Sequence, residues 1–115
     1  IARMHRENIG HGDLRAGNIM CRHSKEWHFS LIDNERTRKY RKLPESIRIK
    51  NLVQLNLLIS PVIKKTDRQR FFHNYSMLCY GEINKNLLKK VINKTSKRLK
   101  IMVDKQKIAA SDLWL

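Results

Sequence analysis

The sequence predicts an α+β fold that is mostly α-helical, with one small β-hairpin close to its N-terminal end. Apolar residues alternate with polar ones over short stretches of residues 19–32, which is typical of strands, and they recur at helical spacing over residues 49–102. The 115 residues fit one domain. We expect this domain over residues 1–103 and a C-terminal tail over residues 104–115. No apolar run approaches the roughly 20 residues of a membrane-spanning helix.

The N-terminal third should contain the end of a helix, a loop and the hairpin. Residues 1–8 have the pattern of a helix end, and two glycines break it, so that residues 9–18 form a loop. The first strand is predicted at residues 19–21, and the polar residues after it form a turn. The second strand is predicted at residues 27–32, where the alternating apolar residues are Trp27, Phe29 and Leu31.

Three helices should form the remainder of the domain. The first is expected to end at Pro61. The residues that recur at helical spacing in it are Ile49, Leu52, Val53, Leu55, Asn56 and Ile59. The second should begin with a capping box of Thr66 and Gln69 and end at Gly81, with core aromatic residues Phe71, Phe72 and Tyr75. The third should be capped by Asn84 and bury Leu87, Leu88, Val91, Ile92, Leu99 and Met102.

The two cysteines, Cys21 and Cys79, are far apart and stand among apolar or aromatic residues. We expect them to be free thiols in the core, which indicates a reducing compartment, the cytoplasm.

The chain is strongly basic, with a formal net charge of +15. Residues 41–115 hold 17 Lys and Arg against 5 Asp and Glu, a net charge of +12. Such a field attracts polyanions, whether nucleic acid, an anionic membrane surface or a phosphorylated glycolipid. The last helix should carry a basic face, either simply solvated or in contact with a membrane, made of Lys85, Lys89, Lys90, Lys94, Lys97, Arg98 and Lys100.

A group of polar residues flanks the predicted hairpin and suits phosphoryl transfer. Asp13 lies in the loop, where a carboxylate can orient an acceptor hydroxyl and take its proton. Asn18 comes just before the first strand and Asp33 just after the second, so the hairpin should bring them together. Their oxygens are hard ligands that suit Mg²⁺. A metal clamp on the phosphates and an aligned nucleophile are the main needs of this chemistry.

The spacing His11-x-Asp13-x-x-x-x-Asn18, with Asp33 at the end of a strand, resembles the catalytic loop of the protein-kinase-like superfamily. The resemblance implies a kinase C-terminal lobe that uses ATP and Mg²⁺, with Asp13 as catalytic base and Asn18 and Asp33 as Mg²⁺ ligands. It also implies that His11 and Gly12 are structural residues of the loop. Gly12 replaces the arginine usual in eukaryotic protein kinases, and His-Gly-Asp is common in small-molecule kinases.

Three further segments are similar to the lipopolysaccharide kinases, which phosphorylate heptose or Kdo sugars of the inner core: residues 31–38, 51–56 and 67–75. This resemblance implies a lipopolysaccharide core acceptor. With the cysteines and the basic face, we expect a cytoplasmic enzyme in peripheral contact with the inner face of the membrane. Candidate substrate-binding residues are Arg15, Arg36 and Arg38, since arginine suits phosphate and carboxylate recognition. For Arg36 and Arg38, ordinary surface ion pairing is the alternative.

The nucleotide-binding lobe of such kinases carries a Gly-rich loop, a phosphate-binding lysine and its glutamate partner. None of these can be placed in the sequence. We therefore expect the N-terminal lobe to be absent, the chain to be a fragment, and the fragment alone to be inactive. Three alternatives stay open: another small-molecule or protein kinase of the superfamily, a non-catalytic relic of a kinase, or a basic polyanion-binding module, for which the pI of about 10.4 is the argument.

Overall fold

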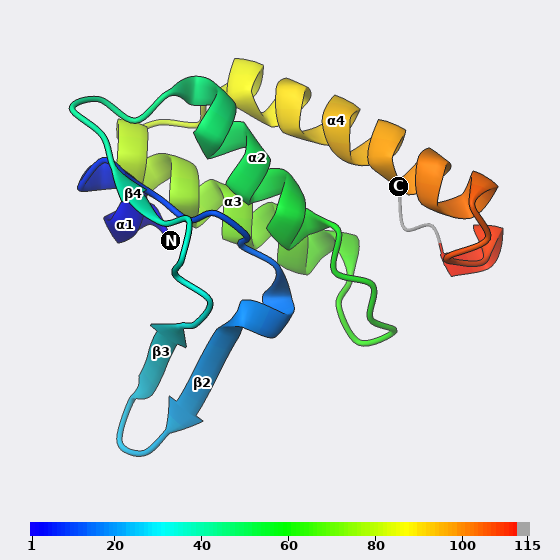
Figure 1. The fold of residues 1–115 in the computed structure, drawn as a ribbon, viewed down its shortest axis with the longest axis horizontal. Helices are drawn as coiled ribbons and strands as arrows, with labels where there is room; N and C mark the ends of the chain where they lie inside the picture. Colours follow the sequence, from blue (N-terminus) through cyan, green and yellow to red (C-terminus); the bar gives the residue numbers. More distant parts are fainter. Residues whose placement is uncertain (113–115) are drawn as a thin grey trace.

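The computed structural model describes residues 1–112, in which helices pack together and a β-hairpin extends away from them (Figure 1). The elements in chain order are α1 (Ala2–Arg6), β1 (Ile9–Gly10), the 3-10 helix η1 (Ala16–Asn18), β2 (Ile19–His23), β3 (Trp27–Leu31), β4 (Arg38–Lys39), α2 (Glu45–Asn56), α3 (Lys65–Tyr80), α4 (Lys85–Asp104) and the 3-10 helix η2 (Ala110–Asp112). The predicted α+β class is confirmed. The fold also contains a short antiparallel pairing of β1 with β4, which the sequence did not predict.

The predicted hairpin is present as β2 and β3, paired antiparallel with Ile19 opposite Leu31. One more hydrogen bond, from the Ile32 N–H to the Asn18 carbonyl at 2.9 Å, continues the pairing beyond the strands. Two of the three alternating apolar residues are not covered by the described part of the chain, since Trp27 is 61% and Phe29 68% exposed, whereas Leu31 is half-buried.

Both cysteines are free thiols, as predicted, but Cys21 is exposed on this hairpin, so its prediction as a core residue is wrong. Cys79 is half-buried. The physical reason is that β2 pairs with β3 alone, and no described element packs over the strand.

The hydrophobic core lies where α1, α2, α3 and α4 meet. Its buried residues are Ala2, Ile49, Leu52, Val53, Phe72, Tyr75, Leu87 and Val91. These come from segments far apart in the sequence, and their burial supplies the main favourable free energy that holds the helices together. None of the helices within residues 1–112 has the length and apolar content needed to cross a bilayer.

The first long helix, α2, ends at Asn56, before the predicted stop at Pro61. The guanidinium of Arg68 explains this: it donates hydrogen bonds to the main-chain carbonyls of Asn56, at 2.8 Å, and of Leu58. The carbonyls at the end of a helix have no partner within the helix. Here the Arg68 side chain of α3 supplies that partner, so the helix stops at this point. Ile59 consequently lies in the loop between α2 and α3.

The start of α3 also differs from the prediction. The helix begins at Lys65, and the main-chain N–H of Lys64 donates to the Asp67 carboxylate at 2.8 Å, so the predicted capping box of Thr66 and Gln69 is wrong. A carboxylate in the first turn is favoured there by the positive end of the helix dipole. Two other predictions are confirmed. Gly81 ends α3 with a φ of 72°. Asn84 caps the start of α4, where its side chain accepts a hydrogen bond from the Leu87 N–H at 3.0 Å.

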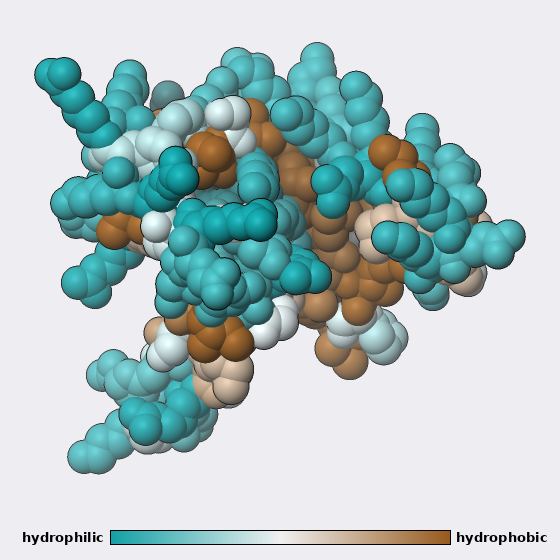
Figure 2. Space-filling model, in the orientation of Figure 1, coloured by the Kyte–Doolittle hydropathy of each residue, from teal (hydrophilic) through white to brown (hydrophobic). Residues whose placement is uncertain are grey.

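Two helical residues predicted to be buried are exposed, Phe71 at 43% and Ile92 at 41%. They line an apolar groove of about 620 Å³ between α2, α3 and α4, whose other apolar walls include Leu55, Leu58, Ile63 and Leu88. Figure 2 shows hydrophobic surface gathered in the region between α2 and α4. No residue of the loop 11–18 lines this groove. The site described next is therefore separate from it.

Candidate active site

The loop over residues 11–18 runs from β1 to the hairpin and is anchored at two buried residues, His11 and Leu14. Gly12 lets the chain pass close to the segment that follows the hairpin, because a Cβ at this position would overlap the Cβ of Arg36 and lie 3.0 Å from its main chain. A residue with a side chain therefore does not fit at position 12 in this conformation of the chain.

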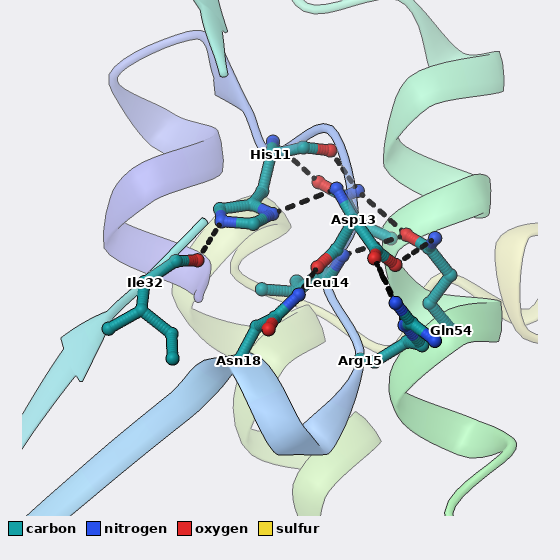
Figure 3. A network of polar contacts seen from close by, with 8 residues as sticks. His11, Asp13, Leu14, Arg15, Asn18, Ile32 and Gln54 are labelled. Carbon is teal, nitrogen blue, oxygen red and sulfur yellow. Dashed lines mark hydrogen bonds and ion pairs between the residues drawn. The ribbon is translucent and has the colours of Figure 1, made fainter. Parts of the chain in front are cut away.

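The imidazole of His11 links the loop to the hairpin (Figure 3). Its Nδ1 accepts a hydrogen bond from the Asp13 N–H at 3.0 Å, and its Nε2 is 3.1 Å from the Ile32 carbonyl oxygen. A carbonyl can only accept, so Nε2 carries the hydrogen and the ring is the neutral Nε2–H tautomer. His11 thus holds the backbone of Asp13 beside the residue that precedes Asp33.

The carboxylate of Asp13 has a different partner on each oxygen. Its Oδ1 accepts from the Gln54 amide at 3.2 Å, and its Oδ2 forms an ion pair with Arg15 at 2.6 Å (Figure 3). The hydrogen bond and the charge of Asp13 raise the pKa of Arg15, with a smaller contribution in the same direction from Asp33. The Arg15 side chain, 71% exposed, thus lies in the field of both carboxylates.

Asn18 and Asp33 stand at the open end of the hairpin, as the sequence predicts. The Asn18 amide nitrogen donates to the Asp13 carbonyl at 2.8 Å, which fixes the orientation of the side chain. Its Oδ1 makes no hydrogen bond within residues 1–112 and so remains available as a ligand. Asp33 is exposed and has a φ of 57°, a left-handed backbone conformation that occurs often at functional sites.

This donor set fits Mg²⁺ better than a transition metal. Mg²⁺ binds hard oxygen ligands and is commonly held by one or two carboxylates together with substrate phosphates and water. Within the described residues no group of three or more His, Cys, Asp or Glu side chains gathers that could hold a metal ion. Asn18 and Asp33 could each supply an oxygen ligand at this end of the hairpin, and a cation there would need further ligands from a substrate.

The two other arginine candidates lie beside the same loop. Arg36 approaches Gly12, and Arg38 is paired with Gly10 across β1 and β4. Both side chains are exposed, and neither forms an ion pair within residues 1–112. Their predicted part in substrate binding remains a prediction.

Helix α2 holds this loop through two residues that the sequence analysis did not single out as site residues, Asn51 and Gln54. Asn51 is fully buried; its Nδ2 donates to the His11 carbonyl at 2.7 Å and its Oδ1 accepts from the His11 N–H at 3.1 Å. Gln54, one turn later, accepts from the Leu14 N–H at 3.0 Å. The available signal was two polar residues one helical turn apart in the otherwise apolar stretch of residues 51–55.

A chain of buried hydrogen bonds continues from Asn51 to the far side of the core. Because Asn51 Oδ1 can only accept, His5 Nε2 donates to it, at 3.0 Å, and His5 Nδ1 accepts from the Tyr75 hydroxyl at 2.6 Å. The Tyr75 oxygen in turn accepts from Arg48 at 2.6 Å. Burial lowers the pKa of His5 to about 4 and raises the pKa of Tyr75, so both groups are neutral near pH 7.

The buried neutral His5 predicts a pH-dependent stability. Its pKa is about 4 in the folded chain and 6.5 for an ordinary imidazole, so the unfolded chain binds this proton at a higher pH. The contribution of His5 to stability is present above pH 6.5 and is lost as the pH falls toward 4, by about 3 kcal/mol in the free energy of unfolding.

Urea denaturation at pH 7 and pH 4 measures this effect. The variant His5→Gln keeps a side-chain amide in place of the ring but has no proton to bind, so the drop between the two pH values should be smaller by about 3 kcal/mol. The remaining histidines are common to both proteins and cancel in the comparison. Equal drops in the two proteins would show that His5 is not the responsible group.

A carboxylate in a loop beside a hairpin, with amide and carboxylate oxygens at the open end of that hairpin, is an arrangement that suits phosphoryl transfer. The family model described as "Lipopolysaccharide kinase (Kdo/WaaP) family" matches residues 1–75 of the 115. The chain belongs to this family, as the resemblance in its sequence predicts. No curated protein and no solved structure is detectably similar to the chain.

Proposed function

We propose that this chain carries the catalytic loop and metal ligands of an ATP-dependent kinase that phosphorylates a sugar hydroxyl of the lipopolysaccharide inner core, on heptose or Kdo. Its helices and hairpin would form the C-terminal lobe of a protein-kinase-like fold. Family membership supports a sugar kinase of lipopolysaccharide core synthesis. The observation that carries the proposal furthest is the placement of Asp13 next to Asn18, whose Oδ1 is free, at the open end of the hairpin.

In the proposed reaction Asp13 aligns the acceptor hydroxyl and takes its proton. The hydroxyl oxygen forms a bond to the terminal phosphorus of ATP, the bond from that phosphorus to the bridging oxygen breaks, and ADP leaves. Mg²⁺ bound by Asn18 and Asp33 would neutralise phosphate charge. Arg15, now on Asp13 Oδ2, would exchange this partner for the transferred phosphoryl group, which frees Oδ2 for the acceptor.

The positive charge of the chain supports the proposed acceptor and location of the enzyme. Arg36 and Arg38 are exposed beside the loop and would contact phosphate or carboxylate groups of the core. On α4 the basic face is exposed at Lys85, Lys89, Lys94, Lys97, Arg98 and Lys100. We place the enzyme in the cytoplasm, with this face against the anionic inner surface of the membrane.

The test is transfer of labelled phosphate from ATP to dephosphorylated lipopolysaccharide core, measured with the 115-residue chain and with the complete gene product across a Mg²⁺ titration. We expect Mg²⁺-dependent transfer by the complete product and none by the chain alone. The variant Asp33→Asn should raise the half-saturating Mg²⁺ concentration at least tenfold, since even outer-shell changes at metal sites cost about 10–100-fold. Asp104→Asn, an exposed aspartate at the end of α4, is the matched control and should behave as wild type.

Three results would contradict parts of this proposal. Transfer to another acceptor but not to core sugars would reject the substrate. An Asp33→Asn variant with an unchanged Mg²⁺ requirement would reject the metal site. Salt-sensitive binding of nucleic acid or other polyanions without phosphate transfer would reject catalysis and favour the basic binding module.

A further inference from the structure

Gln54 of α2 contacts the loop both at its backbone and at its carboxylate (Figure 3). Its side-chain oxygen accepts from the Leu14 N–H at 3.0 Å, and its side-chain nitrogen donates to Asp13 Oδ1 at 3.2 Å. The orientation of the amide follows from the partners alone. A backbone N–H can only donate, so the oxygen of Gln54 must face Leu14 and the NH₂ group must face Asp13.

The two oxygens of Asp13 are held in unequal ways. Gln54 is half-buried on a helix whose neighbouring residues belong to the core, and it is fixed by a second hydrogen bond to Leu14. Arg15 is a long side chain, 71% exposed, on the same loop as Asp13. A long exposed cation can change partner at little cost in free energy, whereas a doubly bonded amide on a packed helix cannot. Oδ1 is therefore the fixed oxygen and Oδ2 the exchangeable one.

We propose that Gln54 is a positioning residue for catalysis: it fixes the plane of the Asp13 carboxylate, so that Oδ2 is the oxygen that takes the proton of the acceptor hydroxyl. This inference rests on the proposed kinase function. A neutral amide is suited to the task because it donates one hydrogen bond and brings no charge that would compete with the base. Alignment of this kind is effective because small displacements of a reacting group cost large factors in rate.

Asn51 has a different part, although it lies only one helical turn away. Its amide bonds to both main-chain groups of His11 and to His5, and it makes no contact with the Asp13 carboxylate. Loss of Asn51 should therefore affect folding, and loss of the Gln54 donor should affect the rate. Helix α2 thus contacts the same loop twice: Asn51 stabilises its fold, and Gln54 positions its carboxylate.

The experiment compares Gln54→Glu, Gln54→Leu and Gln69→Glu in the complete gene product. Gln54→Glu has the same length and keeps an oxygen for the Leu14 N–H, but it loses the donor to Asp13. We expect kcat to fall about 100-fold, as for a misplaced catalytic group, with KM for ATP changed less than twofold. Gln69→Glu makes the same change at an exposed position of α3 and should keep wild-type kcat.

The NMR signal of the Leu14 amide in the 115-residue chain separates this role from a purely structural one. It should stay in place in Gln54→Glu and move in Gln54→Leu, while both variants lose activity. A loss of kcat in Gln54→Leu alone would mean that Gln54 only holds the loop through Leu14, and would overturn the proposal. So would a kcat within threefold of wild type in Gln54→Glu. If the wild-type protein transfers no phosphate to any acceptor, the proposed function itself is wrong, and the role of Gln54 falls with it.

Discussion

Replacing Asp13 by asparagine should lower kcat for phosphate transfer by several hundredfold or more. A positioned general base contributes roughly 10²–10⁴-fold to a rate, and the asparagine amide cannot take the proton. The change is nearly isosteric. The main-chain bonds of residue 13 to His11 and Asn18 do not involve the carboxylate and should persist, so the loop should keep its conformation.

The measurement is single-turnover transfer by the complete gene product, together with its affinity for ATP. Affinity should change less than threefold, because the carboxylate acts on the acceptor and not on the nucleotide. Asp112→Asn, at an exposed position near the C-terminus, is a control that should keep the wild-type rate. A variant Asp13→Asn that retains a tenth or more of the wild-type rate would exclude Asp13 as the base.

Replacing Asn51 by leucine should destabilise the fold by roughly 3–5 kcal/mol, because it removes the partner of three buried groups at once. These are the N–H and carbonyl of His11 and the Nε2–H of His5. Each buried donor or acceptor left without a partner costs about 1–3 kcal/mol. Leucine has a similar volume to asparagine and leaves no cavity, so the loss of stability would come from the missing hydrogen bonds. Since domains are stable by only about 5–15 kcal/mol, this is a large fraction of the total.

Urea denaturation of the 115-residue chain at pH 7 gives the free energy of unfolding for both proteins. Asn93→Leu, at an exposed position of α4, makes the same substitution without a buried partner and should change the stability by less than about 0.5 kcal/mol. If Asn51→Leu costs no more than Asn93→Leu, the hydrogen bonds of Asn51 do not stabilise the fold.

The elements that depend on local pattern could be predicted from the sequence. The alternation over residues 27–32 predicted β3, the asparagine at position 84 predicted the start of α4, and the glycine at 81 predicted the end of α3. The hairpin also brought the backbones of Asn18 and Ile32 together, as its pairing required. The chemical roles of the residues at its end remain predictions.

Features that depend on distant contacts could not be predicted in this way. The end of α2 is set by Arg68 from the next helix, and the partners of Asn51 lie 40 and 46 positions away in the sequence. Periodicity shows which face of an element is apolar but not which part of the chain will cover it. Cys21, Phe71 and Ile92 were therefore expected in the core and are exposed.

The close approach of Gly12 to Arg36 limits how this loop can evolve. No side chain fits at position 12 unless the segment after Asp33 takes another path, because tightly packed main chain cannot yield to a new Cβ. A single substitution at position 12 therefore cannot place a side chain in the loop without a change in the path of the segment around Arg36. A lineage that acquires a side chain at position 12 must also rebuild the chain around Arg36, so we expect the two stretches to change together during evolution.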